Sequence, residues 1–351
     1  MSRIAAVHGV LAPHRHEQRD ITDLMARICL PDGERGVLDR LHTNAGVRTR
    51  HTVLPLDRYA ALDGFGMVND AFIAAATELG AEAVDAALHA ARISPREVDL
   101  LLFTSVTGIA APSVDARLVG RLGLRPDVKR LPLFGLGCVA GAAGIGRLHD
   151  YLRGWPGHVA VLLSVELCSL TFQRHDASPA GLVAAGLFGD GAAALVACGT
   201  DRRPKGPCPT VVATRGHLYP DTESVMGWDV TDTGFRVVLD STVPDVVRKH
   251  LAADVDAFLG DHGLTRRDVS AWVCHPGGPR VLEAMAETLE LPDGALDITW
   301  RSLAAVGNLS SSSVLHVLRD TLAERPPPPG TPGLLLALGP GFCSELVLLR
   351  W

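Results

Sequence analysis

The amino-acid sequence predicts an α/β fold, in which helices cover a sheet that is buried on both faces. Short, mostly apolar runs such as 159–165 and 333–338 alternate with segments of helical period, which is typical of buried strands between helices. Aromatic residues make up only 5% of the 351 residues, whereas glycine occurs 36 times. The core is therefore expected to consist of small and branched aliphatic side chains, which let helices and strands approach closely.

Composition and charge exclude several classes of protein. Apolar residues make up 47% and charged residues 21%, so the chain is neither disordered nor fibrous. The net charge of −6 offers no basic field for a phosphate backbone, so no nucleic-acid partner is expected. No run of 18 apolar residues is present, which predicts no membrane span. Seven cysteines without a Cys-x-x-Cys pair, and an N-terminus without a signal-peptide pattern, favour the reducing cytoplasm and predict no metal site.

Two stretches of the chain share the order helix, charged turn and buried strand, which indicates an internal duplication. Their limits are 79–91, 93–99 and 100–103 in the first stretch, and 244–259, 264–270 and 271–274 in the second. The two turns open at Ile93 and Leu264, which are 171 positions apart. The same offset takes Cys138 to position 309, beside Asn308.

Both halves of the chain also close in the same way. A glycine turn precedes an apolar strand at 189–191 and again at 339–341. We expect an N-terminal half, 1–200, and a C-terminal half, 201–351, joined within the charged, proline-bearing segment 199–209. Loops from two such halves can converge on one site in the middle of the molecule.

Cys138 stands at the predicted junction between a strand, 129–134, and a helix of small residues that runs to Leu152. At a helix N-terminus, unpaired backbone N–H groups and the helix dipole favour an anion, so the pKa of the thiol is expected to fall. Glycines before the cysteine permit a tight turn and let a substrate approach the backbone. A buried cysteine in a Gly/Ala-rich helix contact would show the same pattern, so this position alone does not establish a nucleophile.

His275 and Asn308 are the other two candidate catalytic residues. His275 ends the predicted strand 271–274 and is followed by Pro-Gly-Gly-Pro, so it points out of the sheet end, where open α/β folds place their ligands. A solvent-exposed turn histidine would fit as well. Asn308 precedes a helical pattern that begins at Val314, and helix capping alone would also explain it.

A thiol, an imidazole and a carboxamide together fit one reaction. A thiolate accepts an acyl group from a thioester, and hydrogen-bond donors stabilise the oxygen that gains charge. The amide of an asparagine can stabilise an enolate oxygen, which a carboxylate would repel. No carboxylate base is needed if loss of CO2 from a malonyl thioester generates the carbanion. The three residue types therefore predict a decarboxylative Claisen condensation.

Five segments, in the same order and with similar spacing over nearly the whole chain, resemble those of type III polyketide synthases, the chalcone synthase-like family. They are GLGCVAG (135–141), LFGDGAAA (187–194), CHPGGPR (274–280), VGNLSSSS (306–313) and LGPGF (338–342). The resemblance implies a thiolase-like αβαβα fold built from two duplicated halves, a homodimer, and coenzyme A thioesters as substrates, without a metal or redox cofactor. It also implies a catalytic triad of Cys138, His275 and Asn308.

The resemblance further implies residues that shape the substrate site. Phe188 and Phe235 are implied to be apolar gatekeepers of the chamber, and an apolar wall that excludes water would encourage decarboxylation. The implied cavity residues are Cys168, Thr171 and Ala111. At Ala111 the plant enzymes carry a methionine that reaches across the dimer. Arg48 and Arg50 match the family's basic segment near the coenzyme A phosphates.

The starter substrate is predicted from the amino-acid sequence of two segments. The sequence around Cys138 and the segment 164–172 look like bacterial members that make alkylpyrones or alkylresorcinols. This predicts a medium or long fatty acyl-CoA starter that is extended by several malonyl-CoA units and then cyclised. The alternative is a tetrahydroxynaphthalene-type synthase, which is primed by malonyl-CoA itself.

Three other functions stay open at this point. The pattern GxGxxA at 135–140 also fits the dinucleotide fingerprint of an NAD-dependent oxidoreductase, although the acid expected about 20 residues onward is missing. A ketoacyl synthase of the initiating kind resembles this chain in fold and triad, but takes malonyl from a carrier protein. A catalytically inactive thiolase-fold partner protein would not need an intact triad.

Overall fold

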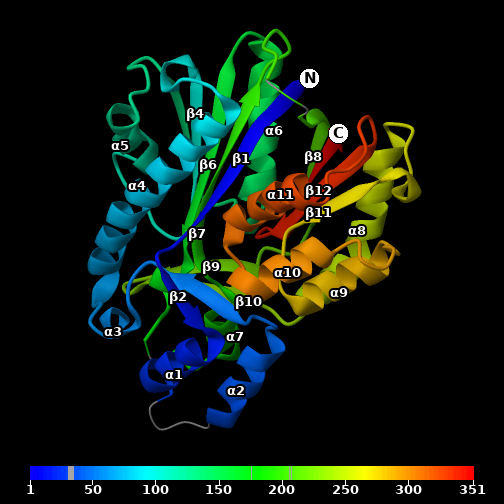
Figure 1. Cartoon of the computed structure of the whole chain (residues 1–351). Helices are drawn as coiled ribbons and strands as arrows, with labels where there is room; N and C mark the ends of the chain where they lie inside the picture. The colour runs from blue at the N-terminus through cyan, green and yellow to red at the C-terminus, as the bar shows by residue number, and fades with distance from the viewer. Residues whose placement is uncertain (31–34, 175, 205, 207) are drawn as a thin grey trace.

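The computed structural model describes residues 1–30, 35–174, 176–204, 206 and 208–351. In this part of the chain, one large mixed sheet runs through the molecule and helices pack on both of its faces and in the middle (Figure 1). In spatial order its nine strands are β11 (Ala271–Cys274), β12 (Pro332–Gly339), β13 (Cys343–Arg350), β8 (Thr210–Leu218), β1 (Ser2–Leu11), β7 (Asp190–Cys198), β6 (Val159–Leu167), β4 (Leu100–Thr104) and β5 (Lys129–Leu133).

The sheet consists of the same arrangement twice. In the N-terminal half β4 is parallel to β6, and β7 and β1 continue the sheet antiparallel. In the C-terminal half β11 is parallel to β12, and β13 and β8 continue it antiparallel. The halves join where β1 pairs with β8, at Ser2 with Val211 and Arg3 with Thr210. The predicted duplication is therefore present in the strand order.

The two charged turns that suggested the duplication are the same local structure. Ser94 caps η1 (Pro95–Glu97), and its backbone N–H donates to the Glu97 carboxylate at 2.9 Å. Thr265 caps η4 (Arg266–Asp268), and its N–H donates to the Asp268 carboxylate at 2.8 Å. Such capping boxes satisfy backbone donors that the first turn of a helix leaves free. The repeat is thus encoded locally, by a hydroxyl residue and an acid three positions later.

Helices form three layers around the two halves of the sheet, which confirms the αβαβα arrangement. One outer layer contains α4 (Gly64–Ala91) and α5 (Val114–Arg121); the middle layer contains α6 (Ala140–Gly154) and α11 (Ser313–Glu324); the other outer layer contains α8 (Val243–Gly260), α9 (Pro279–Thr288) and α10 (Asp297–Val306). Three apolar cores fill the spaces between these layers. In the middle, a Cβ placed on Gly141 would lie 2.3 Å from the backbone oxygen of Ser311, so only glycine allows this approach.

A smaller group of elements covers the end of the sheet where the reactive residues lie (Figure 1). It consists of α1 (Gln18–Cys29), α2 (Arg35–Asn44), α3 (Leu56–Tyr59), α7 (Pro179–Leu187), and the strand pairs β2 (His14–Glu17) with β3 (Thr49–Thr52) and β9 (Met226–Thr231) with β10 (Gly234–Leu239). The predicted joining segment 199–209 links β7 to β8, although Lys205 and Pro207 lie outside the described residues. The boundary between positions 200 and 201 stays a prediction.

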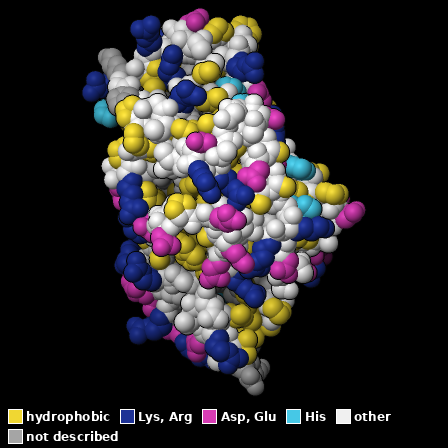
Figure 2. Space-filling model, turned by 90° about the vertical axis from the view of Figure 1, so that its right-hand side faces the viewer, with side chains coloured by type: hydrophobic (Ala, Val, Ile, Leu, Met, Phe, Trp, Pro, Cys, Tyr) yellow, Lys and Arg dark blue, Asp and Glu magenta, His cyan; other side chains and the backbone are white. Residues whose placement is uncertain are grey.

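Charges of both signs are interspersed on the face shown in Figure 2, which is the right-hand side of Figure 1. Among the exposed ion pairs of the described residues, Arg248 on α8 pairs with Glu287 on α9 at 3.0 Å. Such exposed ion pairs each contribute little to stability. Within the described ranges, no helix combines the length and apolarity needed to cross a bilayer.

Candidate active site

The three candidate catalytic residues come together where the two halves of the molecule meet. Cys138 lies in η2 (Gly137–Val139), directly before α6, and Asn308 lies two positions before η5 (Ser310–Ser312), which leads into α11. His275 follows the last residue of β11. All three line one cavity of about 370 Å³ of empty space, together with apolar residues that include Phe188 and Phe342. The duplication places the starts of the two middle helices at the same spot, and β11 supplies the histidine.

Cys138 sits on a tight elbow in the wall of this cavity. Gly137 has a φ of +56°, and a Cβ there would lie 2.4 Å from Pro340, so the turn requires glycine. The sulfur lies 3.5 Å from the hydroxyl oxygen of Ser310, and the residue is 8% exposed. Burial raises the pKa of the Cys138 thiol to about 12.

The direction of that pKa shift corrects the expectation from the sequence. The hydrogen bond with Ser310 does favour the thiolate, but removal of the sulfur from water outweighs it. Cys138 is therefore a neutral thiol in the substrate-free protein. Activation of the nucleophile has to come from a proton acceptor that acts when the substrate is present.

His275 is held rigidly by its backbone while its ring is left unbonded. Its N–H donates to the Leu336 carbonyl at 2.8 Å, and its carbonyl accepts from the N–H of Gly277 at 2.9 Å. The residue is 1% exposed, and neither ring nitrogen has a hydrogen-bond partner among the described residues. Burial lowers the pKa of His275 to about 3, so the imidazole is neutral and one ring nitrogen can accept a proton.

The pKa shifts of Cys138 and His275 have the same cause and support one mode of action. Desolvation disfavours either charge when it forms alone. A thiolate and an imidazolium that form together attract each other strongly, because little water screens them. The cavity therefore favours a proton transfer from sulfur to imidazole that is coupled to attack on a substrate.

Asn308 both caps a turn and presents an amide to the cavity. Its Oδ1 accepts from the N–H of Ser310 at 2.7 Å and from the hydroxyl of Ser313 at 3.4 Å. These bonds fix which side of the carboxamide carries the NH2 group, since the oxygen side is occupied. Nδ2 donates weakly to the Gly277 carbonyl at 3.4 Å, on the loop that follows His275. The capping role and the site role foreseen for Asn308 are thus compatible.

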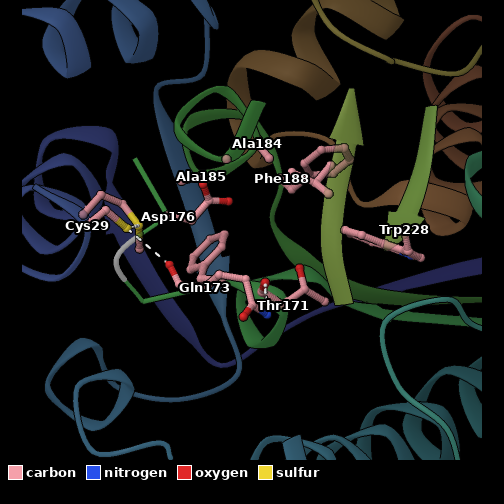
Figure 3. Close-up of a pocket in the computed structure, with 12 residues that line it drawn as sticks. Cys29, Thr171, Gln173, Asp176, Ala184, Ala185, Phe188 and Trp228 are labelled. Atoms are coloured by element: carbon pink, nitrogen blue, oxygen red, sulfur yellow. Dashed lines mark hydrogen bonds between the residues drawn. The ribbon is translucent and has the colours of Figure 1, made fainter. Parts of the chain in front are cut away.

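Phe188 separates this cavity from a second one, of about 410 Å³ of empty space, which is shown in Figure 3. Thr171 lines the second cavity, and its assignment as an acyl-cavity residue stays a prediction. Cys29 and Asp176 lie at one end of the view and Trp228 lies at the other. Phe188 is half-buried and lines both spaces, which is the placement expected of a gatekeeper.

Phe235 lines neither cavity, contrary to the expectation. Its ring packs against Phe65, Phe134 and Trp228, with centroid distances of 5.2, 5.9 and 6.1 Å. Val237 lines the second cavity instead, from the same face of β10 two positions later. Two residues along a strand span about 7 Å and return to the same face. The gatekeeper assignment to Phe235 was therefore one position too early among the residues of that face.

The remaining predicted site residues lie outside the cavity walls. Cys168 is 3% exposed and is in η3 (Cys168–Thr171), but neither cavity includes it. Ala111 lies on an exposed loop, and Arg48 is also exposed. Arg50 is 1% exposed and its Nη1 donates to the carbonyl oxygen of Phe188 at 2.6 Å. The expectation for Arg50 is therefore wrong, because a guanidinium buried in this way cannot reach coenzyme A phosphates at the surface.

Glu166 is a buried carboxyl near the site, and no catalytic or binding role was predicted for it. It is the last residue but one of β6 and accepts hydrogen bonds from the Val106 N–H at 3.2 Å, the Thr107 hydroxyl at 3.0 Å and the Ser311 hydroxyl. Burial raises the pKa of Glu166 to about 7. A charged residue within a mostly apolar strand, together with the serine run 310–313, was the available signal.

The fold and this reactive, water-poor cavity together indicate the class of thiolase-like condensing enzymes. Family models of chalcone and stilbene synthases match almost the whole chain, the N-terminal domain over residues 4–202 and the C-terminal domain over residues 210–351. The chain belongs to this family, and it is accordingly a type III polyketide synthase, an acyltransferase that condenses malonyl-CoA. The GxGxxA segment carries Cys138 on its elbow, so it is not used as a dinucleotide fingerprint.

Similar proteins cover the chain from end to end. It is 60% identical over 350 residues to 1,3,6,8-tetrahydroxynaphthalene synthase of Streptomyces peucetius subsp. caesius, which covers 99% of this chain and 93% of that protein. It is 28% identical over 358 residues to phloroglucinol synthase of Pseudomonas fluorescens, with 100% and 99% covered. The solved structure of 1,3,6,8-tetrahydroxynaphthalene synthase from Streptomyces coelicolor A3(2) superimposes with a TM-score of 0.94 at 31% identity, covering 99% of both chains.

The buried carboxyl of Glu166 gives a pH-dependent stability with a definite sign. Folding raises its pKa from 4.5 to about 7, so the folded chain holds this proton more tightly than the unfolded chain does. This contribution to stability is present below about pH 4.5 and is lost as the pH rises to about 7. Glu166→Gln removes the titration. Its unfolding free energy relative to wild type is expected to rise across that window by on the order of 3 kcal/mol.

Chemical denaturation at pH 5 and pH 8 measures this difference. Glu283→Gln on α9 is the matched control, because its side chain is exposed and stays in water in both states. A Glu166→Gln difference that is the same at both pH values would contradict a buried, protonated carboxyl.

Proposed function

We propose that this enzyme is a tetrahydroxynaphthalene-type synthase, in which malonyl-CoA serves both as starter and as extender. The observation that carries the proposal is the 60% identity, over 99% of the chain, to a relative of that name. The second cavity supports it, because Gln173 and Asp176 line it beside Thr171. A long alkyl chain placed there would desolvate these polar groups without offering them a hydrogen bond. We therefore favour the malonyl-CoA-primed alternative over the fatty acyl-CoA starter and the alkylpyrone-type product.

In the proposed mechanism, the sulfur of Cys138 attacks the thioester carbonyl of the starter while His275 accepts the thiol proton. The tetrahedral intermediate collapses, the bond to the coenzyme A sulfur breaks, and coenzyme A leaves as the thiol with that proton. The starter is now held as a thioester on Cys138. Proton transfer within the dry cavity avoids a separate, costly charge on either residue.

Extension then uses the electrons that CO2 leaves behind. The carbon–carbon bond to the carboxylate of a second malonyl-CoA breaks, and the electron pair forms an enolate whose oxygen is stabilised by Asn308 and His275. The enolate carbon attacks the thioester carbonyl on Cys138, and the sulfur leaves. The elongated chain returns to Cys138 for the next cycle, until it cyclises. Apolar walls such as Phe188 exclude water and so disfavour the malonyl carboxylate before it is lost.

A ladder of starters tests the substrate assignment. Purified enzyme is incubated with malonyl-CoA alone, and with malonyl-CoA plus acyl-CoAs of two to sixteen carbons, and the products are identified by mass. We expect malonyl-CoA alone to give the aromatic product at the full rate, with long acyl-CoAs adding little. If product formation requires a long acyl-CoA, the result would support the alkylpyrone-type product instead. Dependence on an acyl carrier protein would favour an initiating ketoacyl synthase.

Two substitutions separate the proposed roles within the site. Cys138→Ala is expected to abolish polyketide formation from every starter, since no thioester can form. Asn308→Ala is expected to lower the rate of malonyl-CoA decarboxylation by about 10²-fold or more, since a donor to the enolate oxygen is lost. Release of CO2 and mass analysis of products measure the two effects. An active Cys138→Ala enzyme would refute the assignment of the nucleophile.

We further propose that the enzyme is a homodimer in a reducing compartment. Leu131 in the edge strand β5 and Phe134 directly after it are 38% and 53% exposed, Ile109 on the loop after β4 is 46% exposed, and all seven cysteines are free thiols. Phe134→Glu should shift the sedimentation coefficient from that of a dimer to that of a monomer. Leu218→Glu is the control and should cause no shift, because Leu218 is 64% exposed but lies at the end of β8, away from β5. A monomeric wild-type protein at micromolar concentration would contradict the dimer.

A further inference from the structure

A buried cation lies directly behind the wall of the active-site cavity. Arg50, in β3, is 1% exposed, and it makes no ion pair within 4 Å in the described part of the chain. The carboxylate of Asp190 attracts it only at longer range, since its oxygens accept from the Val53 N–H and from Ser169. Burial lowers the pKa of Arg50 to about 10, so it stays charged near neutral pH. A buried cation without a contacting counter-ion is costly, which points to a role beyond packing.

Within the described part of the chain, the guanidinium of Arg50 makes a single hydrogen bond, to the Phe188–Gly189 peptide unit, which is itself hydrogen-bonded to Asn308. Nη1 donates to the Phe188 carbonyl at 2.6 Å, whereas Nε and Nη2 have no partner in the described structure. The N–H of the same peptide unit, that of Gly189, donates to the Asn308 carbonyl at 2.9 Å. The N–H of Asn308 in turn donates a hydrogen bond to the Leu187 carbonyl at 2.9 Å. A charged donor on the carbonyl polarises the peptide and strengthens its N–H as a donor to Asn308.

The stem of Arg50 and its neighbours in β3 also support the turn that precedes Asn308. A Cβ on Gly307 would lie 3.2 Å from Cδ of Arg50, so the aliphatic stem packs against this glycine. The hydroxyl of Thr49 donates to the Ala305 carbonyl at 2.5 Å, at the end of α10. Arg50 is therefore in contact with both sides of the bridge between Phe188 and Asn308.

We propose that Arg50 is a positioning residue, which fixes the carboxamide of Asn308 and the ring of Phe188 relative to each other through the backbone bridge between them. Arg50 does not touch the substrate. It keeps the amide donor in line with the oxygen that gains charge during decarboxylation, a step for which small displacements are expensive. The inference rests on the proposed role of Asn308.

Three measurements on Arg50→Met and Arg50→Lys test this role. They are kcat and KM for malonyl-CoA decarboxylation, and the rate at which iodoacetamide alkylates Cys138. In Arg50→Met, kcat is expected to fall about tenfold or more, with KM and the alkylation rate within about twofold of wild type. Arg50→Lys keeps a charged donor and is expected to recover most of kcat. Arg15→Met, on the adjacent strand β2, is the control, because Arg15 is exposed and should leave all three unchanged.

Wild-type kcat in Arg50→Met, or an equal loss of decarboxylation and alkylation, would overturn the positioning role. If Arg50→Met does not fold, Arg50→Gln, which keeps a neutral donor, carries the same test and should lose part of kcat. Asn308→Ala separates the two hypotheses. Normal decarboxylation in Asn308→Ala would reject the proposed function, whereas normal decarboxylation in the Arg50 variants alone would reject only this inference.

Discussion

The exclusion of water around Cys138 and His275 is the constraint on which the rest of the structure depends. In this environment the thiol and the imidazole are both neutral, because burial disfavours either charge alone. The same environment makes a charge pair, or a donor aimed at an anionic oxygen, much stronger than it would be in water. The site is therefore inert without a substrate, and charge forms only when partners for it are present.

The duplicated fold is what makes such a site possible. Two copies of one arrangement place the starts of α6 and α11 against each other in the middle layer, and glycine at 141 allows the close approach. The surrounding layers of helices and sheet keep water away from that point. The gate residue Phe188 and the donor Asn308 lie on one backbone bridge, so access to the cavity and stabilisation of charge are mechanically connected. Arg50, on β3, is also linked to this bridge, although it lies 138 positions from Phe188 in the sequence.

Much of the fold and the positions of the candidate triad could be predicted from the sequence, because their signals are local. A hydroxyl residue followed by an acid at the third position marks both capping boxes, at Ser94 and at Thr265. Cys138 follows a glycine at the start of a helix of small residues, and His275 lies between the apolar strand β11 and Pro-Gly-Gly, which the pattern of residues reveals directly. The family resemblance then joined residues that the pattern alone left separate.

What could not be predicted depends on contacts between distant segments. The pKa of Cys138 rises because the whole molecule buries it, whereas the sequence shows only the helix start that would lower it. Arg50 looks like a surface cation until β3, paired with β2, is packed against Phe188. Val237, and not Phe235, lines the cavity because of the position of β10 relative to its neighbouring elements. The alternation of side chains along the strand shows which residues share a face, but it does not specify that position.

Peptide mapping after rapid acid quench tests the central claim most directly. Wild-type enzyme mixed with malonyl-CoA should carry a thioester-linked acyl group on the peptide that contains Cys138, and none on those that contain Cys168 or Cys343. An acyl group on another cysteine, or turnover without any acyl-enzyme at Cys138, would contradict a condensing site built on this buried thiol.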